Sequence, residues 1–314
     1  MAIGDLLYRA AGPAAKVMDR LSMARKLILV ASAFVACIAL LLVMIIPRLS
    51  ADIAFVRNEM AGARLIEPYV HVAGATVRRG VARQHLAAGD SEAQAAFEAS
   101  TAQIESELAE IANWVATDSS ALDIVAEWAA IKDGWAVLRA DPSTEAEAIF
   151  VAHASFGARL AALMSTVTVT SSLALDPALD TYGLMDATTT RLPAMLTSAG
   201  NARAHSRHPI ERGSVEVEDV VDSQAELRLG AMSLGQAESI MAAAFTANPA
   251  LRELLGAELQ GLRASYDAFG SVVGAGIVYG SAPTLDIAGL DRELDKALDA
   301  LAKLGSNGSR QLLH

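Results

Sequence analysis

An unbroken apolar run near the N-terminus constrains this chain more than any other feature of its sequence. From Leu27 to Ile46 the sequence LILVASAFVACIALLLVMII contains no charged residue. Because a helix rises 1.5 Å per residue, about 20 residues span roughly 30 Å, which is the thickness of the hydrocarbon core of a bilayer. The run therefore predicts a transmembrane helix over residues 27–46.

The charges on either side of this run predict its orientation. Basic residues are more frequent before it than after it: Arg9, Lys16, Arg20, Arg25 and Lys26 precede it, and Arg48 and Arg57 follow. Since positive charge is retained in the cytoplasm, we expect residues 1–26 to be cytoplasmic and the chain after Pro47 to be extracytoplasmic. In a Gram-negative host the anchor would lie in the inner membrane and the bulk of the chain in the periplasm.

A cleaved signal peptide is the alternative interpretation of the same run. The apolar core of a signal peptide is normally about 7–15 residues long, and an A-x-A-like cleavage site follows it. Here the run is longer and IIPRLSADIAF follows, which favours an uncleaved anchor. The best later candidate for a second span, Ser271–Gly280, is broken by glycine and too short to cross a bilayer.

Composition limits what the rest of the chain can do. The 314 residues are 53% hydrophobic but only 5% aromatic, and Ala and Leu dominate, which favours helices over strands. A net charge of −11 argues against a nucleic-acid partner, because phosphate binding needs clustered Lys and Arg. The single cysteine, Cys37, lies in the apolar run, so an intramolecular disulfide or a thiolate metal site cannot form.

Residues 47–304 are predicted to form an extracytoplasmic, all-α domain. Apolar residues repeat at spacings of three and four from Ile53 to Val70, and this helical pattern continues to about Ala88. A helix of about 40 residues would be roughly 55–60 Å long, which suits an elongated helical bundle or two stacked bundles. Turn signals separate the further helices that we expect at 91–117, 122–138, 178–203, 215–247, 250–275 and 284–304.

Two segments of this domain need separate arguments. Residues 163–175 are rich in Thr and Val and favour a strand by propensity, but an isolated strand would leave its backbone groups unpaired, so we expect helix. The last helix carries a leucine stripe from Leu290 to Leu304, for which a core face is favoured over a dimer seam. The polar, glycine-rich residues 305–314 are expected to form a flexible tail.

Three segments carry a resemblance to a known family. The first comprises LSMARKLILVASAF and ADIAFVRNEMAG around the apolar run, the second is RGVARQHLAAGD at 79–90, and the third is LDPALDTYGLMDATTTRLP at 175–193. Together they resemble the extracytoplasmic sensor region of bacterial methyl-accepting chemotaxis proteins, over residues 21–304. Thr181 and Gly183 depart from the Ser and Tyr of the family's pattern. The sequence stops before the second transmembrane helix and signalling domain that such receptors carry, which is expected of a fragment or of a chain without its output half.

The resemblance implies a homodimeric sensor that binds a small ligand, or a ligand-loaded binding protein, between its helices. Binding would shift a helix that leads back to the membrane. The same kind of sensor also serves histidine kinases and diguanylate cyclases, which is one alternative; a complete single-pass periplasmic scaffold or binding protein without an output domain is another. The sequence contains no phosphate-binding glycine loop, GxSxG, HExxH or kinase signature, so we expect neither an enzyme nor a cofactor.

Arginines supply the first candidate ligand-binding residues. Arg78, Arg79 and Arg83 cluster on one expected helix, and Arg79 and Arg83 share a face. Guanidinium groups that face into a bundle suit small anions, because they bind bidentately and stay charged. A solvated face without a ligand is the alternative, and the resemblance favours a functional role for Arg79. Tyr182 and Arg191 are further candidates, although they can lie in a different layer of the bundle.

Other polar residues of the third segment are expected to have structural roles: Asp176, Pro177, Asp180 and Asp186. Asp176 and Pro177 mark a turn, Asp180 is expected to cap the next helix, and Asp186 is expected to pair with Arg191 or Arg203.

Metal binding is not expected from the histidines. His205 and His208 are three residues apart at a helix end, but no third ligand has a suitable spacing. His71 and His85 lie about four turns apart on one helical face, which is too far for a common ion.

Overall fold

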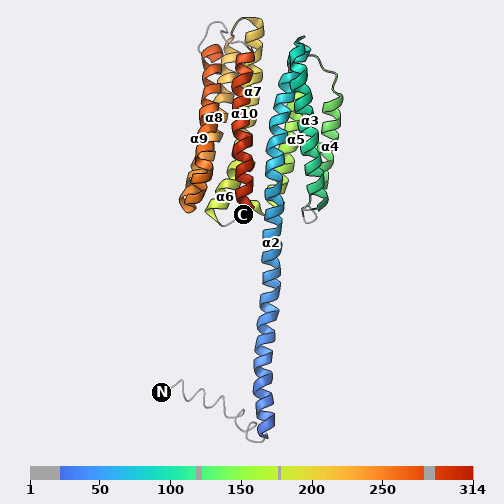
Figure 1. Ribbon diagram of the computed structural model, residues 1–314, viewed down its shortest axis with the longest axis vertical. Coiled ribbons are helices and arrows are strands. Elements are labelled where there is room, and N and C mark those ends of the chain that lie inside the picture. Colours follow the sequence, from blue (N-terminus) through green and yellow to red (C-terminus); the bar gives the residue numbers. More distant parts are fainter. Residues whose placement is uncertain (1–21, 118–121, 176–177, 279–286, 314) are drawn as a thin grey trace. The chain divides into compact units, whose positions relative to one another are not determined.

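The computed structural model describes residues 22–117, 122–175, 178–278 and 287–313, and every regular element among them is helical. The chain divides into two units, Met1–Val56 and Arg57–His314. A long apolar N-terminal helix is followed by a helical bundle (Figure 1), which confirms the expected fold class.

The N-terminal helix α2 runs from Met23 to Ala87 and belongs to both units. In the first unit its large apolar side chains are exposed, including Leu27, Phe34 and Ile46. An exposed apolar helix of this length suggests a membrane anchor or a signal sequence. In the second unit the same helix contributes buried side chains to the core of the bundle from Ala61 onward.

Among the described residues, the later helix that is long and apolar enough to cross a membrane is α5 (Ala146–Thr170), and not the segment 271–280 that the sequence favours. Phe156, Leu160 and Val167 of this helix are buried at helical spacing. These side chains belong to the core cluster of the second unit, so α5 fits the description of an apolar core helix.

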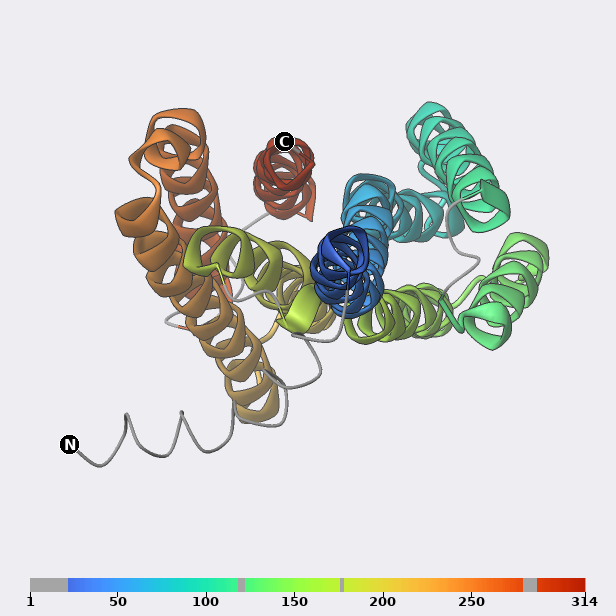
Figure 2. The same cartoon turned by 90° about the horizontal axis from the view of Figure 1, so that it is seen from below.

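In the second unit α3 (Gln94–Thr117), α4 (Val125–Ala140) and α5 lie on the same side as the C-terminal half of α2 (Figures 1 and 2). A 3₁₀ turn, η1 (Ser91–Ala93), connects α2 to α3, and Gly89 allows the turn because its φ of 90° is left-handed. The indole nitrogen of Trp114 donates a hydrogen bond to the carbonyl oxygen of Ala61 at 2.7 Å, which fixes α3 against α2.

The remaining helices form the other side of the second unit. They are α6 (Leu179–Asp186), α7 (Leu192–Arg212), α8 (Val217–Ala247), α9 (Pro249–Val273) and α10 (Ile287–Leu312), with the π-helical turns η4 (Ala187–Arg191) and η5 (Gly274–Val278). Gly213 follows the last residue of α7, and its φ of 75° is the left-handed conformation that terminates many helices. The leucine stripe of α10 is buried, as expected for a core face.

Helices α7 and α10 both extend well beyond the ends that the sequence predicts. Helix α7 continues through Pro209 to Arg212 instead of ending near Arg203. The expected flexible tail at 305–314 is wrong, because α10 continues to Leu312. Gly305 lies against Val70, and Ser309 donates a hydrogen bond to the carbonyl oxygen of Ala63 at 3.1 Å, so small residues here allow close contact between α10 and α2.

A glycine in α8 provides a test of the packing between α8 and α9. A Cβ atom at Gly230 would overlap the hydroxyl of Tyr266, which donates a hydrogen bond to the carbonyl oxygen of Leu227 at 3.0 Å. Overpacking of this kind costs about 2 kcal/mol, so Gly230→Ala is expected to destabilise the protein by that amount in urea unfolding of the detergent-solubilised chain. Adding Tyr266→Phe to Gly230→Ala should restore part of the lost stability. The control Gly261→Ala places its Cβ in open space on the surface of α9 and should cause no loss of stability.

Candidate functional site

A groove of about 430 Å³ lies among α2, α5 and the continuous η4–α7 segment. Its volume falls within the range of small-molecule pockets, about 300–1,000 Å³. The lining residues come from all three elements and are mostly small or apolar, among them Ala73, Val77 and Gly80 of α2, Ala154, Ala158 and Ala161 of α5, and Pro193, Ala194 and Leu196 of α7.

Small residues leave this space open. Added Cβ atoms at Gly157 and Gly200 would meet no other atom within 4 Å. The threonine hydroxyls that line the groove donate hydrogen bonds within their own helices, for example Thr168 to Met164 at 2.8 Å and Thr189 to Met185 at 2.9 Å. The walls therefore offer few hydrogen-bond donors to a ligand, although the hydroxyl oxygens still can accept.

Besides threonines, Tyr69, Ser165 and Asn201, the groove is lined by three polar side chains at one end, Gln84 of α2, His153 of α5 and Arg203 of α7. Among the residues that the structure describes, Arg203 is the one Arg, Lys, Asp or Glu that lines the groove. The Arg203 side chain is only 3% exposed. A charge so well buried needs partners, because desolvation of an unpaired ion is costly.

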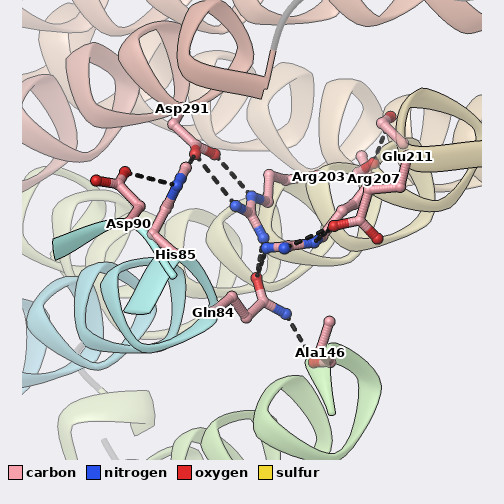
Figure 3. A network of polar contacts seen from close by, with 10 residues as sticks. Gln84, His85, Asp90, Ala146, Arg203, Arg207, Glu211 and Asp291 are labelled. Atoms are coloured by element: carbon pink, nitrogen blue, oxygen red, sulfur yellow. Dashed lines mark hydrogen bonds and ion pairs between the residues drawn. The ribbon is translucent and has the colours of Figure 1, made fainter. Parts of the chain in front are cut away.

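Arg203 obtains these partners from α10 and α2 (Figure 3). Its Nε donates to Oδ1 of Asp291 at 2.7 Å and its Nη2 donates to Oδ2 at 3.1 Å, while its Nη1 donates to Oε1 of Gln84. His85 lies 2.6 Å from Oδ2 of the same aspartate. Burial acts to raise the pKa of Asp291, but the His85 hydrogen bond and the charge of Arg203 outweigh it and hold that pKa below its usual value. The carboxylate of Asp291 is therefore ionised at neutral pH.

The network extends further on α7 and α5 (Figure 3). Arg207 donates to Oε1 of Gln84 at 3.3 Å and to Glu211 at 2.6 Å, and Gln84 donates to the carbonyl oxygen of Ala146 at 2.8 Å. One end of the groove is thus held by side chains from α2, α7 and α10 and by the first residue of α5.

His153 separates the groove from a second buried arginine. Arg79 donates from Nη1 to Nε2 of His153 at 2.8 Å, and the other ring nitrogen lies 2.7 Å from the carbonyl oxygen of Ile149. Because an arginine can only donate, Nε2 accepts and Nδ1 carries the proton, so the ring is neutral. Burial, with the charges of Arg79 and Arg83, lowers the pKa of His153 to about 4.

Arg79 itself is 4% exposed and faces the interior of the bundle, which is one of the two arrangements that the sequence left open. Its Nε donates to Thr101 at 3.1 Å, and its guanidinium lies 4.7 Å from the ring centre of Phe97 and 5.3 Å from that of Trp135. Aromatic faces stabilise a desolvated cation. Burial and the charge of Arg83 lower the pKa of Arg79 below its usual value.

The structure does not bring the predicted arginines together at one ligand site, because each has its own partners. Arg78 forms ion pairs with Asp295 at 3.2 Å and with Asp299, both on α10. Arg83 donates to the carbonyl oxygen of Ser143 at 2.9 Å, before α5. Neither these two nor Arg79 lines the groove. Arg78 instead lines a separate cavity of about 470 Å³ beside α3 and α10, where acidic and basic side chains pair with one another.

The candidates in the third segment have partners of their own. Arg191 donates to Asp186 at 2.9 Å, which confirms one of the two expected pairings, and to Gln236 at 2.8 Å. Neither partner is shared with Arg79, so the two arginines belong to separate contacts. Tyr182 is partly buried and packs against the core.

The expected capping role of Asp180 is wrong. Helix α6 begins at Leu179, so Asp180 lies inside the first turn, and the residue at the cap, Ala178, has no side-chain hydrogen bond. The carboxylate of Asp180 instead accepts a hydrogen bond from Asn248 at 3.2 Å. Asp176 and Pro177 lie outside the described residues.

The two neighbouring histidines of α7 pair with carboxylates. His205 lies 4.0 Å from Asp222, and His208 lies 3.5 Å from Glu147. Within the described parts of the chain, no group of three or more His, Cys, Asp or Glu residues is arranged to hold a metal ion.

Gln84, His153 and Arg203 were not identified as site residues by sequence reasoning, although a signal for two of them exists. His153 interrupts the buried stripe of α5 that includes Phe156 and Leu160, and Arg203 interrupts the buried stripe of α7 that includes Leu196 and Ala199. A polar residue on an apolar stripe marks a buried polar site. Comparison of the chain with protein-family models, curated proteins and solved structures finds no match.

Proposed function

We propose that this chain is the extracytoplasmic sensor module of a transmembrane receptor of the chemoreceptor type, and that the groove binds its ligand. One observation carries the proposal: α2 bears the membrane-length apolar run and also contributes groove residues from Tyr69 to Gln84. A ligand in the groove therefore contacts the helix that carries the anchor. The resemblance of residues 175–193 to chemotaxis receptors supports the same function. In this proposal residues 1–26 are cytoplasmic, the helical bundle is periplasmic and the receptor is a homodimer.

Helix α10 gives such a receptor a second element that responds to the ligand. It is bonded to α2 by Ser306 with His71 at 2.8 Å and by Asp291 with His85 at 2.6 Å. Asp291 also holds Arg203 at the groove, so a ligand that changes the position of Arg203 also changes a contact between α2 and α10. Signalling requires that the ligand binds one packing of these helices more tightly than the other.

A fusion receptor tests the proposal. Residues 1–314 are joined to the second transmembrane helix and kinase-controlling half of a chemoreceptor, and kinase output is measured against a panel of anionic, cationic and neutral small molecules. We expect at least one compound to change the output. Gly157→Leu should abolish the response, because its side chain extends into the open groove, whereas the matched variant Gly261→Leu on the surface of α9 should respond normally.

Two results would contradict this function. One is an output that no compound in the panel changes although the fusion is in the membrane and its basal kinase activity is normal. The other is a response that Gly157→Leu leaves intact, which would place the ligand outside the groove.

A further inference from the structure

The charge of the groove lining selects for anions. Arg203 is the single formal charge on the described lining, and His153 is neutral with its proton directed to Ile149. Arg79 and Arg83 lie close enough to lower the pKa of His153 together with its burial, so their positive potential reaches this wall, where Asp141 opposes it only in part. An ammonium ligand would find no carboxylate on the described lining to pair with it, because Asp291, the partner of Arg203, does not line the groove.

Arg203 retains hydrogen-bonding capacity toward a ligand. A guanidinium has five N–H groups in a planar fork. Within the described residues, the hydrogen bonds of Arg203 use one N–H on each of its three nitrogens, two toward Asp291 and one toward Gln84. Each terminal nitrogen therefore has one further N–H, and Arg203 lines the groove. A carboxylate matches this geometry better than a neutral group does, because hydrogen bonds between two ions are the strongest.

The remainder of the groove selects for an apolar body of limited size. Most of its wall residues are alanine, glycine, valine or another apolar residue such as Phe150 and Leu294, and threonine hydroxyls of the lining donate within their own helices. A sugar or polyol would lose more hydrogen bonds to water there than the few polar side chains of the lining, such as Ser165 and Asn201, could replace. Since a cavity of about 150 Å³ holds benzene, a groove of about 430 Å³ accommodates on the order of 15 non-hydrogen atoms.

We infer that the groove binds a monocarboxylate with an apolar aromatic or aliphatic body, and that Arg203 binds the carboxylate. This inference rests on the proposed function and names the ligand class of the same site. The Arg203–Asp291 pair positions the guanidinium, and the small residues of α5 and α7 contact the body.

Three probes with one body and different head groups test this inference. The full chain in lipid nanodiscs is titrated calorimetrically with 4-phenylbutyrate, 4-phenylbutan-1-ol and 4-phenylbutylamine, and empty nanodiscs correct for partition into lipid. We expect the carboxylate to bind at least about tenfold more tightly than the alcohol, because a charge-assisted hydrogen bond replaces a neutral one. The amine is expected to bind more weakly than the alcohol.

Two variants test which residues bind the head group of the ligand and which contact its apolar body. Arg203→Met combined with Asp291→Asn removes both charges of the pair together, so neither is left buried alone. In this double variant the carboxylate should lose its advantage over the alcohol. Gly157→Leu should remove the binding of both, and Gly261→Leu, the same change on the surface of α9, should alter neither.

The outcomes separate this inference from the proposed function. Equal affinity for acid and alcohol, a preference that survives in the double variant, or absence of binding by 4-phenylbutyrate would each overturn the inference. If the fusion receptor then responds to another class of compound, the proposed function stands without it. If 4-phenylbutyrate binds as expected while the fusion receptor responds to nothing, the ligand class stands and the sensor function fails.

Discussion

Arg203→Met is expected to lower the free energy of unfolding by about 3–5 kcal/mol, the usual cost of breaking a buried ion pair from one side. The change removes the two hydrogen bonds that Arg203 donates to the carboxylate of Asp291, at 2.7 and 3.1 Å, and leaves this 12% exposed carboxylate with His85 as its one partner among the described residues. It also removes one partner of Gln84. The measurement is urea unfolding of the detergent-solubilised chain, followed by circular dichroism.

The double variant Arg203→Met with Asp291→Asn is the control for this effect. It replaces the carboxylate that has lost its arginine by a neutral amide, so most of the lost free energy of unfolding should be recovered. His85 can still bond the amide oxygen at this position. If the single variant loses less than about 1 kcal/mol, or if the double variant is no more stable than the single one, the network of Figure 3 does not hold these helices together.

A fall in pH from 6.5 to 4 is expected to remove on the order of 3 kcal/mol of stability through His153. Burial and the neighbouring arginines lower the pKa of His153 to about 4 in the folded protein, whereas the ordinary value of 6.5 applies to the unfolded chain. Between these values the unfolded chain binds a proton that the folded protein does not. The contribution is therefore complete above pH 6.5 and is lost as the pH falls toward 4.

His153→Gln is the variant that isolates this contribution. The glutamine oxygen can accept from Arg79 but does not titrate, so the free energy of unfolding should vary much less between pH 6.5 and 4 than in the parent chain. His71 contributes in another window: the hydrogen bond to Glu107, its largest effect, raises its pKa, so its contribution is lost as the pH rises above 6.5. An unchanged slope in His153→Gln would show that other groups cause the acid sensitivity.

Local pattern was sufficient to predict the helices but not their ends in every case. The three- and four-residue spacing along α2 predicts a helix to about Ala88, and the helix ends at Ala87. The same reasoning failed for α10, because Gly305 and Ser309 have low helix propensity. These small residues allow α10 to approach Val70 and Ala63 closely. Such contacts depend on a helix that is more than 200 residues away in the sequence.

The candidate site shows the same division between local and distant information. The pattern of its own helix left open whether Arg79 faces the interior or the solvent, and its partners Phe97, Trp135 and His153 come from three other helices. Arg203 has no carboxylate partner on its own helix, and its aspartate lies 88 residues away. The groove depends on tertiary packing, because the same alanines and glycines would pack without a gap if the helices lay in a different arrangement.

The position of a single cation on the groove of an acidic protein has a consequence for the speed of ligand capture. With a net charge of −11, the chain repels an approaching anion over distances at which Arg203 exerts little attraction. Added salt shortens the Debye length, from about 30 Å at 0.01 M to about 8 Å at 0.15 M, and weakens this long-range repulsion far more than the desolvated contact at Arg203. For an anionic ligand, the association rate should therefore rise with ionic strength, whereas most steered complexes slow down.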